Sequence, residues 1–447
     1  MRTGKTQNRG TVGTHRCILS LFAVLLAICP LPGRAQVTIG ATEPPVAGAL
    51  LDLKETGTTN KGLGMPRVRL TSLTIPSNQT LAQTIDGNAT TDNWDKDDHI
   101  GLTVYNTNVC IDGNAVPDGL YVWDGDQWQY LGASVAYSVT DPRDGEVYLA
   151  SNFGAAGDWM VENMRYIDDS KMTAKAGDSN MNSSDKYYTY PQSGSIANPG
   201  IKPASWRPAY GLLYTYSAAT LGRQDNVNVN QGQNPGDEPS GNEVELNDKL
   251  DGPDADGYYF IQGICPDGWH IPSDREWNEL EKELYDHADL YSTYDKKRDL
   301  PFIAKYEGGE TYDSWRPEWE TGRNQNNPSS NTIGGAEYRG STGTKGHGFA
   351  IQSPCPVKGS SPATINGTSL SAVRGGFATQ LAGVASGGSV SNYGQYAYFW
   401  SSSVEYQGTT HYYAWYRIVS VYLHGVGVNR QRVARHVPLY SVRCKKD

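Results

Sequence analysis

Phenylalanine, long apolar runs and positive charge are scarce in this sequence, and each shortage argues against a class of protein. Seven Phe residues stand beside 29 Tyr, 11 Trp and 50 Gly, a balance that suits Gly-rich loops and short strands rather than a helical bundle. Beyond the N-terminus, no stretch is apolar and long enough to span a bilayer. The 38 Lys and Arg are outnumbered by 48 Asp and Glu, so the chain lacks the concentrated positive charge that nucleic acid and anionic membrane surfaces attract.

Residues 1–35 carry the pattern of a secretory signal peptide. A basic segment precedes the apolar run "CILSLFAVLLAICPLPGRA", and Gly33 and Ala35 provide the small residues of a cleavage site. Cleavage would leave 33 of the 38 basic residues against all 48 acidic ones, a formal charge of −15. We predict a secreted protein, extracellular or on the outer cell surface. Acylation of Cys29 as a lipoprotein is the alternative, which the bulky Ile28 disfavours.

Sequence motifs of the common enzymes and metal sites are missing. There is no Cys-x-x-Cys or His/Cys cluster for zinc, no His-Glu-x-x-His, no Gly-x-Ser-x-Gly and no phosphate loop. We therefore expect no catalytic residues, no cofactor and no metal. Carboxylates are plentiful, so a glycosidase-type acid/base pair stays open as an alternative, although nothing singles out two of them.

One segment resembles part of a calcium loop. "DGPDADGYY", residues 251–259, places Asp254 and Asp256 close together before Gly257. The first acidic position of such a loop is occupied by Gly252, and no Glu follows at position twelve. We predict a solvated turn here.

Residues 36–133 form the first predicted domain, a small β-rich spacer. "GLTVYNTN" and "GLYVWDGDQWQYLG" read as short alternating strands broken by turn residues. Asp124-Gly125 has the chemistry of a hairpin turn, so we expect Trp123 and Trp128 to pack across it. These stretches resemble a module at the N-termini of surface proteins of Bacteroidota.

Residues 134–447 form the second predicted domain. The strongest local signal is a helix over 273–286, in which Ser273 and Glu276 make a capping box. Its Trp277, Leu280 and Leu284 share one face. The remaining signals are a hairpin turn at Arg143-Asp144-Gly145, a buried strand or short helix within 209–220, and closing strands within 397–403, 412–422 and 438–444.

Six motifs carry a family resemblance. They are "DPRDGEVY", "WMVENMRY", "YGLLYTYSAA", "CPDGWHIPSDREWNEL", "YFWSSS" and "YSVRCKKD". In this order and spacing, residues 138–447 resemble the Fibrobacter succinogenes major paralogous domain family. The Trp-His-Ile-Pro turn and the terminal Ser-Val-Arg-Cys are also similar to the formylglycine-generating, sulfatase-modifying family, which implies an α+β, C-type lectin-like fold.

That resemblance has consequences for the four cysteines after residue 35. In such a fold the N- and C-terminal strands pair beside the helix, which implies a disulfide between Cys265 and Cys444. His270 is then a turn and packing residue rather than a catalytic one. Four cysteines by themselves allow three connectivities. With Cys265 and Cys444 joined, Cys110 and Cys355, which lie in different predicted domains, either pair across the domain interface or remain free. The calcium-binding triplets of C-type lectins are absent from the positions after the helix.

Aromatic and cationic residues in two segments are the candidate ligand-binding residues. Large amphipathic rings and guanidinium groups are the usual anchors of recognition surfaces. The candidates are Trp315, Arg316, Trp319, Arg323, Tyr413 and Trp415. The alternative is that these rings fill the domain's own loops.

We expect a non-enzymatic protein that binds an extracellular glycan or a surface protein. The alternative function is a structural component of a surface appendage or cell-envelope assembly, and an enzyme is a third hypothesis.

Overall fold

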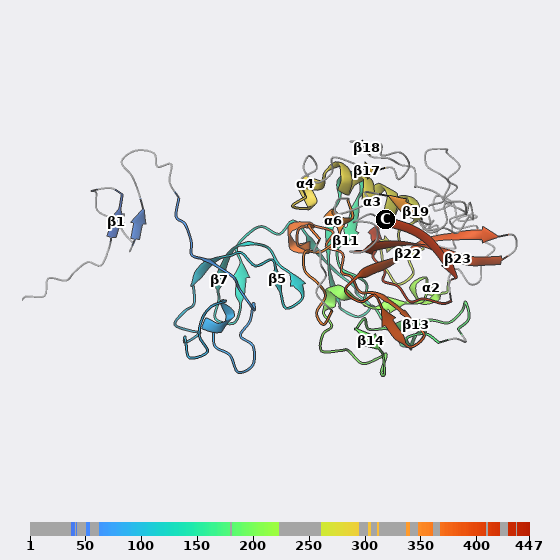
Figure 1. Ribbon diagram of the computed structural model, residues 1–447, viewed down its shortest axis with the longest axis horizontal. Coiled ribbons are helices and arrows are strands. Elements are labelled where there is room, and N and C mark those ends of the chain that lie inside the picture. Colours follow the sequence, from blue (N-terminus) through green and yellow to red (C-terminus); the bar gives the residue numbers. More distant parts are fainter. Residues whose placement is uncertain are drawn as a thin grey trace, which may run out of the picture. The chain divides into compact units, whose positions relative to one another are not determined.

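The computed structural model describes residues 37–40, 42, 51–53, 62–178, 181–222, 261–294, 303–304, 311–312, 337–339, 347–360, 367–407, 410–420, 428–434 and 436–447. The predicted signal peptide and the predicted turn at 251–259 lie outside these residues. The chain divides into two compact units, Met1–Gly64 and Met65–Asp447. Figure 1 shows the ribbon with its elements labelled.

The first unit contains a two-stranded parallel ribbon. Strands β1 (Val37–Ile39) and β2 (Leu51–Leu53) pair with Val37 opposite Leu51 and Ile39 opposite Leu53. Because side chains alternate along a strand, Leu51 and Leu53 lie on one face of the ribbon, and Ile39, opposite Leu53, lies on the same face. Ile39, Leu51 and Leu53 are 57%, 53% and 42% exposed.

Within the second unit, residues 65–133, here called the module, have a hydrophobic core of their own. Its sheet has the order β3-β4-β7-β8. The strands of the module are β3 (Arg67–Val68), β4 (Thr103–Asn106), β5 (Cys110–Ile111), β6 (Asn114–Ala115), β7 (Gly119–Trp123) and β8 (Trp128–Tyr130), with the 3-10 turn η1 (Ala82–Thr84). The expected packing of Trp123 on Trp128 is confirmed, since both are buried with ring centroids 5.7 Å apart.

Residues 134–447, here called the body, begin and end in one five-stranded sheet. Its order is β16-β25-β11-β10-β9. The strands are β9 (Tyr137–Thr140), β10 (Val147–Asn152), β11 (Asp158–Met160), β16 (Trp269–His270) and β25 (Lys445–Lys446). Strand β25 pairs antiparallel with both β11 and β16. The expected pairing of early and late strands is therefore present, and the predicted turn at 143–145 joins β9 to β10.

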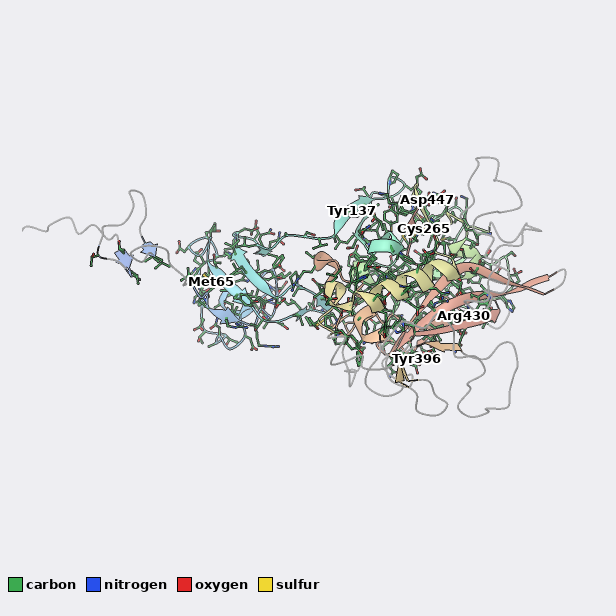
Figure 2. The ribbon with its side chains drawn as sticks, turned by 90° about the horizontal axis from the view of Figure 1, so that it is seen from above. Met65, Tyr137, Cys265, Tyr396, Arg430 and Asp447 are labelled. Carbon is green, nitrogen blue, oxygen red and sulfur yellow. A yellow bond between two sulfur atoms is a disulfide. The ribbon has the colours of Figure 1, made fainter. Side chains whose placement is uncertain are left out.

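A second sheet of the body carries the main core. Its order is β19-β24-β23-β22, from β19 (Glu337–Arg339), β22 (Tyr396–Gln407), β23 (Thr410–Ser420) and β24 (Val428–Ala434). Helix α3 (Asp274–Asp286) packs on one face, where the Trp277 and Phe399 rings are 5.3 Å apart. The other face joins an aromatic core that includes Trp400, Tyr416 and Tyr440. Figure 2 shows α3, in yellow, beside these strands, in red.

Short elements complete the described part of the body. Three small sheets contain β12 (Thr173–Ala174), β13 (Tyr187–Thr189) and β15 (Leu213–Tyr214); β14 (Gly194–Ser195), β20 (Val384–Ser386) and β21 (Ser389–Ser391); and β17 (Ile303–Ala304) and β18 (Thr311–Tyr312). The short helical elements are α2 (Tyr216–Ala219), α4 (Ala288–Tyr291), α6 (Gly348–Ile351), η2 (Gly154–Ala156), η3 (Pro208–Tyr210) and η5 (Ala372–Arg374). The apolar segment 209–220 thus contains both a buried strand and a short helix.

The predicted α+β, C-type lectin-like fold class is wrong, because the chain is β-rich. In the described ranges, α3 is the one α-helix longer than four residues, and strands gather in several small sheets. The prediction gave too much weight to one clearly signalled helix. Strands of two or three residues are too short to show a period in the sequence, so their number was not apparent. The predicted domain boundary near residue 133 stays a prediction.

The predicted helix is confirmed as α3. Ser273 is the N-cap, and its hydroxyl accepts the Glu276 N–H at 3.1 Å while the Glu276 carboxylate accepts the Ser273 N–H at 2.8 Å. Trp277, Leu280 and Leu284 are at most 3% exposed, as their shared face predicts.

Replacing Ser273 with Ala should lower the free energy of unfolding by about 1 kcal/mol, because the N–H of Glu276 loses its acceptor. Denaturant titration of the oxidised protein measures this change. Ser183→Ala, at an exposed position, is the matched control and should leave the stability unchanged. Equal stability of the two variants would contradict the capping role.

Candidate functional site

The predicted ligand-binding residues stay a prediction, because Trp415 is the one of the six whose side chain the structure describes. Trp315, Arg316, Trp319 and Arg323 lie outside the described residues. Tyr413 belongs to β23, but its side chain is outside the described part of the structure.

Trp415 on β23 is only 6% exposed, so its ring offers no free surface for a ligand. The Arg430 guanidinium lies 4.9 Å from the ring centroid. Alternation puts Trp415 on the same side of β23 as Arg417, which is the side that α3 covers. The alternative that this ring fills the domain's own interior therefore holds at Trp415, because residues 414–420 of β23 are all buried.

A buried network of charged side chains joins α3 to strands β23 and β24. The Asp274 carboxylate accepts hydrogen bonds from Arg417 and, at 3.0 Å, from Arg430. Arg417 also donates to Glu281 at 2.9 Å, and His347 lies 3.1 Å from the same carboxylate. All five side chains are at most 1% exposed.

This network is suited to structure rather than to acid catalysis. Burial alone would raise the pKa of Asp274, but Arg417 and Arg430 outweigh it and hold that pKa below its usual range. A buried charge is tolerated only when it is paired in this way, and removing one partner is costly. Asp274 therefore stays ionised and is no candidate for a general acid.

His270 lies in a second polar cluster, at the junction of β16, β25 and α3. Its Nε2 is 3.0 Å from Glu276 Oε1 and its Nδ1 is 2.7 Å from Asp447 Oδ1. Lys445 Nζ reaches the same Glu276 oxygen at 3.1 Å. Burial alone would lower the pKa of His270, but the two carboxylates outweigh it and raise the pKa. The pKa of Glu276 falls to about 2, because His270, Lys445 and the Ser273 N–H outweigh its burial.

The disulfide that the resemblance implies, Cys265–Cys444, is present. Both cysteines are fully buried in the main core. Figure 2 labels Cys265 and Asp447 in the same part of the body. The bond joins the segment before β16 to the residue before β25, and the contact between His270, in β16, and Asp447, directly after β25, ties the same two strands together.

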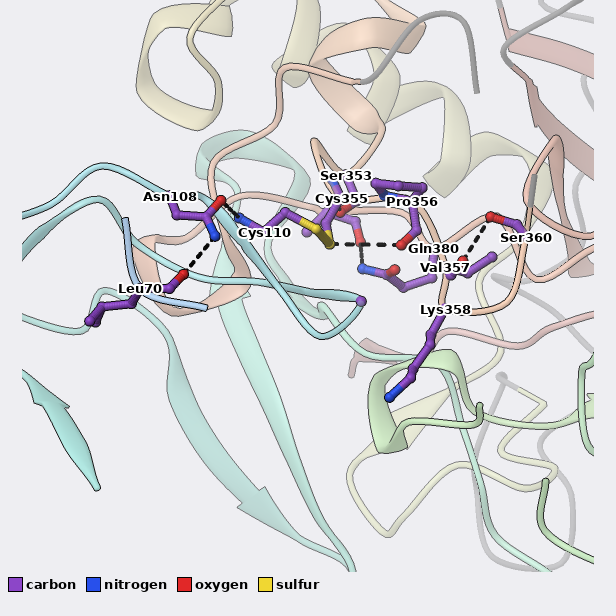
Figure 3. Close-up of a disulfide and its surroundings, with 12 residues drawn as sticks. Leu70, Asn108, Cys110, Ser353, Cys355, Pro356, Val357, Lys358, Ser360 and Gln380 are labelled. Carbon is purple, nitrogen blue, oxygen red and sulfur yellow. Dashed lines mark hydrogen bonds between the residues drawn. A yellow bond between two sulfur atoms is a disulfide. The ribbon is translucent and has the colours of Figure 1, made fainter. Parts of the chain in front are cut away.

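The second disulfide, Cys110–Cys355, settles the pairing that the sequence left open. It joins the β5–β6 hairpin of the module to the segment after α6 in the body (Figure 3). Cys355 is 3% exposed, and its N–H donates to the Ser353 hydroxyl at 3.1 Å. On the module side, the Asn108 amide donates to the Leu70 carbonyl at 2.7 Å and its oxygen accepts the Cys110 N–H at 3.3 Å.

Polar contacts surround this bond at the tip of the hairpin. Asp112 forms ion pairs with Arg207 and Lys358 of the body. Burial alone would raise the pKa of Asp112, but hydrogen bonds from Lys358 and Arg207 outweigh it and lower the pKa. The Tyr210 hydroxyl donates to the Gly113 carbonyl at 2.9 Å and accepts the Lys358 N–H at 2.8 Å. Cys110, Asp112 and Gly113 therefore make the hairpin tip a docked contact, here called the latch.

A second contact between the module and the body lies directly before β7. Arg374 of the body donates to Asp118 of the module at 2.7 Å. At the start of the body itself, the Val135 N–H donates to the Val373 carbonyl at 2.9 Å. The module is thus attached to the body by backbone, by a disulfide and by ion pairs.

Sequence reasoning missed the latch residues other than the cysteines. "CIDGNA" carries an Asp-Gly turn that begins two residues after Cys110, which is a recognisable hairpin signal. Its partners Arg207, Tyr210 and Lys358 are distant in the sequence and carry no motif, so nothing pointed to them.

The described part of the chain shows neither a metal-ligand cluster nor a membrane-spanning helix. No group of three or more His, Cys, Asp and Glu is arranged to hold a metal ion. Among the same residues, no helix has the length and apolar character needed to cross a membrane.

The fold and the latch define a β-rich, disulfide-bonded protein in which a small module is fastened to a larger body. Residues 151–446 match the Fibrobacter succinogenes major domain, and residues 38–142 match a phage tail like trimerisation region. The first match covers more than half of the sequence, so the chain belongs to the Fibrobacter succinogenes major domain family. None of the curated proteins and none of the solved structures matches it.

Changing His270 to Gln should remove stability that depends on pH. The folded-state pKa of His270 is raised, so its charged form stabilises the protein fully below the unfolded-state pKa of about 6.5. This contribution is lost as the pH rises through the folded-state value. We expect the stability difference between wild type and His270→Gln, measured by denaturant titration from pH 5.5 to 9, to shrink with rising pH.

His287→Gln, which removes an exposed imidazole, is the matched control for this experiment. A difference between wild type and His270→Gln that stays constant across the pH range would contradict the role assigned to the cluster.

Proposed function

We propose that this chain is an extracellular, non-catalytic surface protein. Its N-terminal region assembles several copies, and its body is displayed to bind a glycan or protein partner. The predicted signal peptide supports export. Two disulfides support it as well, because such bonds persist in oxidising compartments. The observation that carries the proposal is the latch, which fastens a region resembling a trimerisation region to the family domain.

Assembly of copies is supported by the exposed apolar face of the β1–β2 ribbon. A two-stranded sheet is marginally stable by itself, and parallel sheets are normally covered on both faces. Ile39, Leu51 and Leu53 nevertheless remain about half exposed. The match to a trimerisation region begins at residue 38, inside β1. We propose that this face is buried against the same face of two further copies.

The second candidate function is a structural component of a surface appendage or cell-envelope assembly. The same trimerisation match favours it, because tail-like assemblies are built from repeated copies. The two candidates share the assembled base and differ in whether the body recognises a ligand.

Replacing Ile39 with Asp should dissociate the assembly, because three copies would bring three carboxylates into one apolar seam. Light scattering coupled to size-exclusion chromatography of the full chain should report a trimer for wild type and a monomer for the variant. Ile201→Asp changes a body residue that is 65% exposed and should remain trimeric. A monomeric wild type at micromolar concentration would contradict the proposed assembly.

Glycan-array binding of the full chain separates the two candidates. Recognition by the body predicts signals on a restricted set of glycans that persist in EDTA, since no metal site is expected. Signals abolished by EDTA would contradict metal-free recognition. Silence across diverse glycans, together with co-purification of envelope proteins, would favour the structural role.

A further inference from the structure

The two disulfides enclose overlapping stretches of the chain. Cys110–Cys355 closes one loop and Cys265–Cys444 closes another. Cys265 lies inside the first loop and Cys355 inside the second. Each disulfide therefore shortens the covalent path along a part of the chain that the other disulfide does not bridge.

We infer that the overlapping disulfides and the latch form a tension-bearing device between the N-terminal region and the body. Without cross-links, a force between residues 110 and 444 could extend 334 residues, the difference of the two numbers. With both bonds, a covalent route leads from Cys110 to Cys355 and on to Cys444, which is 444 minus 355, or 89 residues.

A second route runs in parallel with the first. It passes from Cys355 back to Cys265, which is 90 residues, and crosses the disulfide to Cys444. Because the two routes have nearly equal length, both become taut at nearly the same extension and share the force. A single disulfide could not provide this sharing.

The latch changes the point at which a pulling force is applied to the body. The module is followed by β9, the outermost strand of its five-stranded sheet. Force arriving through the backbone alone would separate β9 from β10 one residue pair after another. The Cys110–Cys355 bond instead delivers force to a buried segment that bonds to Thr379 through the Ser353 N–H at 3.0 Å.

Noncovalent contacts seat the hairpin tip closely on the body. A Cβ at Gly113 would lie 2.4 Å from the Tyr210 hydroxyl oxygen, and the φ of Gly113 is +80°. Only glycine tolerates both the close approach and the left-handed backbone. With Asp112 paired to Arg207 and Lys358, the tip stays in register with Cys355 before the disulfide carries load.

Single-molecule pulling of the oxidised full chain, held at its two ends, tests this inference. The segment between residues 110 and 444 should release 89 residues, about 300 Å at roughly 3.4 Å per residue. The double variant Cys110→Ser/Cys355→Ser should release 155 residues, from 110 to 265, which is about 220 Å longer. Its first unfolding event should also occur at lower force, since β9 now carries the load.

Two controls use the same readout. Cys265→Ser/Cys444→Ser retains the 89-residue route and should leave the released length unchanged. Wild type folded first and then reduced with a phosphine should release all 334 residues, about 1,140 Å, which requires no variant to fold. Equal released lengths for oxidised wild type and Cys110→Ser/Cys355→Ser would overturn the inference, as would release of 155 or more residues by the oxidised wild type.

Discussion

The body is closed by a strand of only two residues. Strand β25 lies between β11 and β16, and so few backbone hydrogen bonds could not hold it there unaided. Cys444, the residue before β25, is bonded to Cys265, and Asp447, the residue after β25, contacts His270. The strand is therefore held at both of its ends. Once β25 is in place, β16 is positioned and the chain enters α3 three residues later. Most of the remaining core is arranged around these elements.

Helix α3 is held by charge as well as by apolar packing. Its first residue, Asp274, lies between two buried arginines from β23 and β24. Buried ions are costly unless they are paired, so removing either arginine would leave a buried carboxylate without full compensation. Trp277 and its neighbours supply the apolar contact with the sheet. Charge pairing and packing together orient the helix on a sheet whose other face is aromatic.

Polar and covalent contacts also hold the module against the body. The two parts have separate cores, yet a disulfide, ion pairs and a buried tyrosine hydroxyl fasten the β5–β6 hairpin to the body. A body joined to its base only by a short backbone segment would reorient freely. Fastening it at the latch instead holds the body in a defined orientation on the module.

Features that depend on residues close together in the chain could be predicted from the sequence. The Ser273–Glu276 capping box, the apolar face of α3 and the Trp123/Trp128 hairpin all depend on residues within a few positions of one another, and they were predicted correctly. The family resemblance supplied the Cys265–Cys444 pairing. Long-range features could not be read from the sequence: nothing near Trp415 in the chain showed that its ring would be buried. Whether Cys110 and Cys355 pair stayed open, and the partners of Asp112 lie far along the chain. Only tertiary structure decides these contacts, because they depend on which distant segments meet, and short strands leave no periodic signal of where they pair.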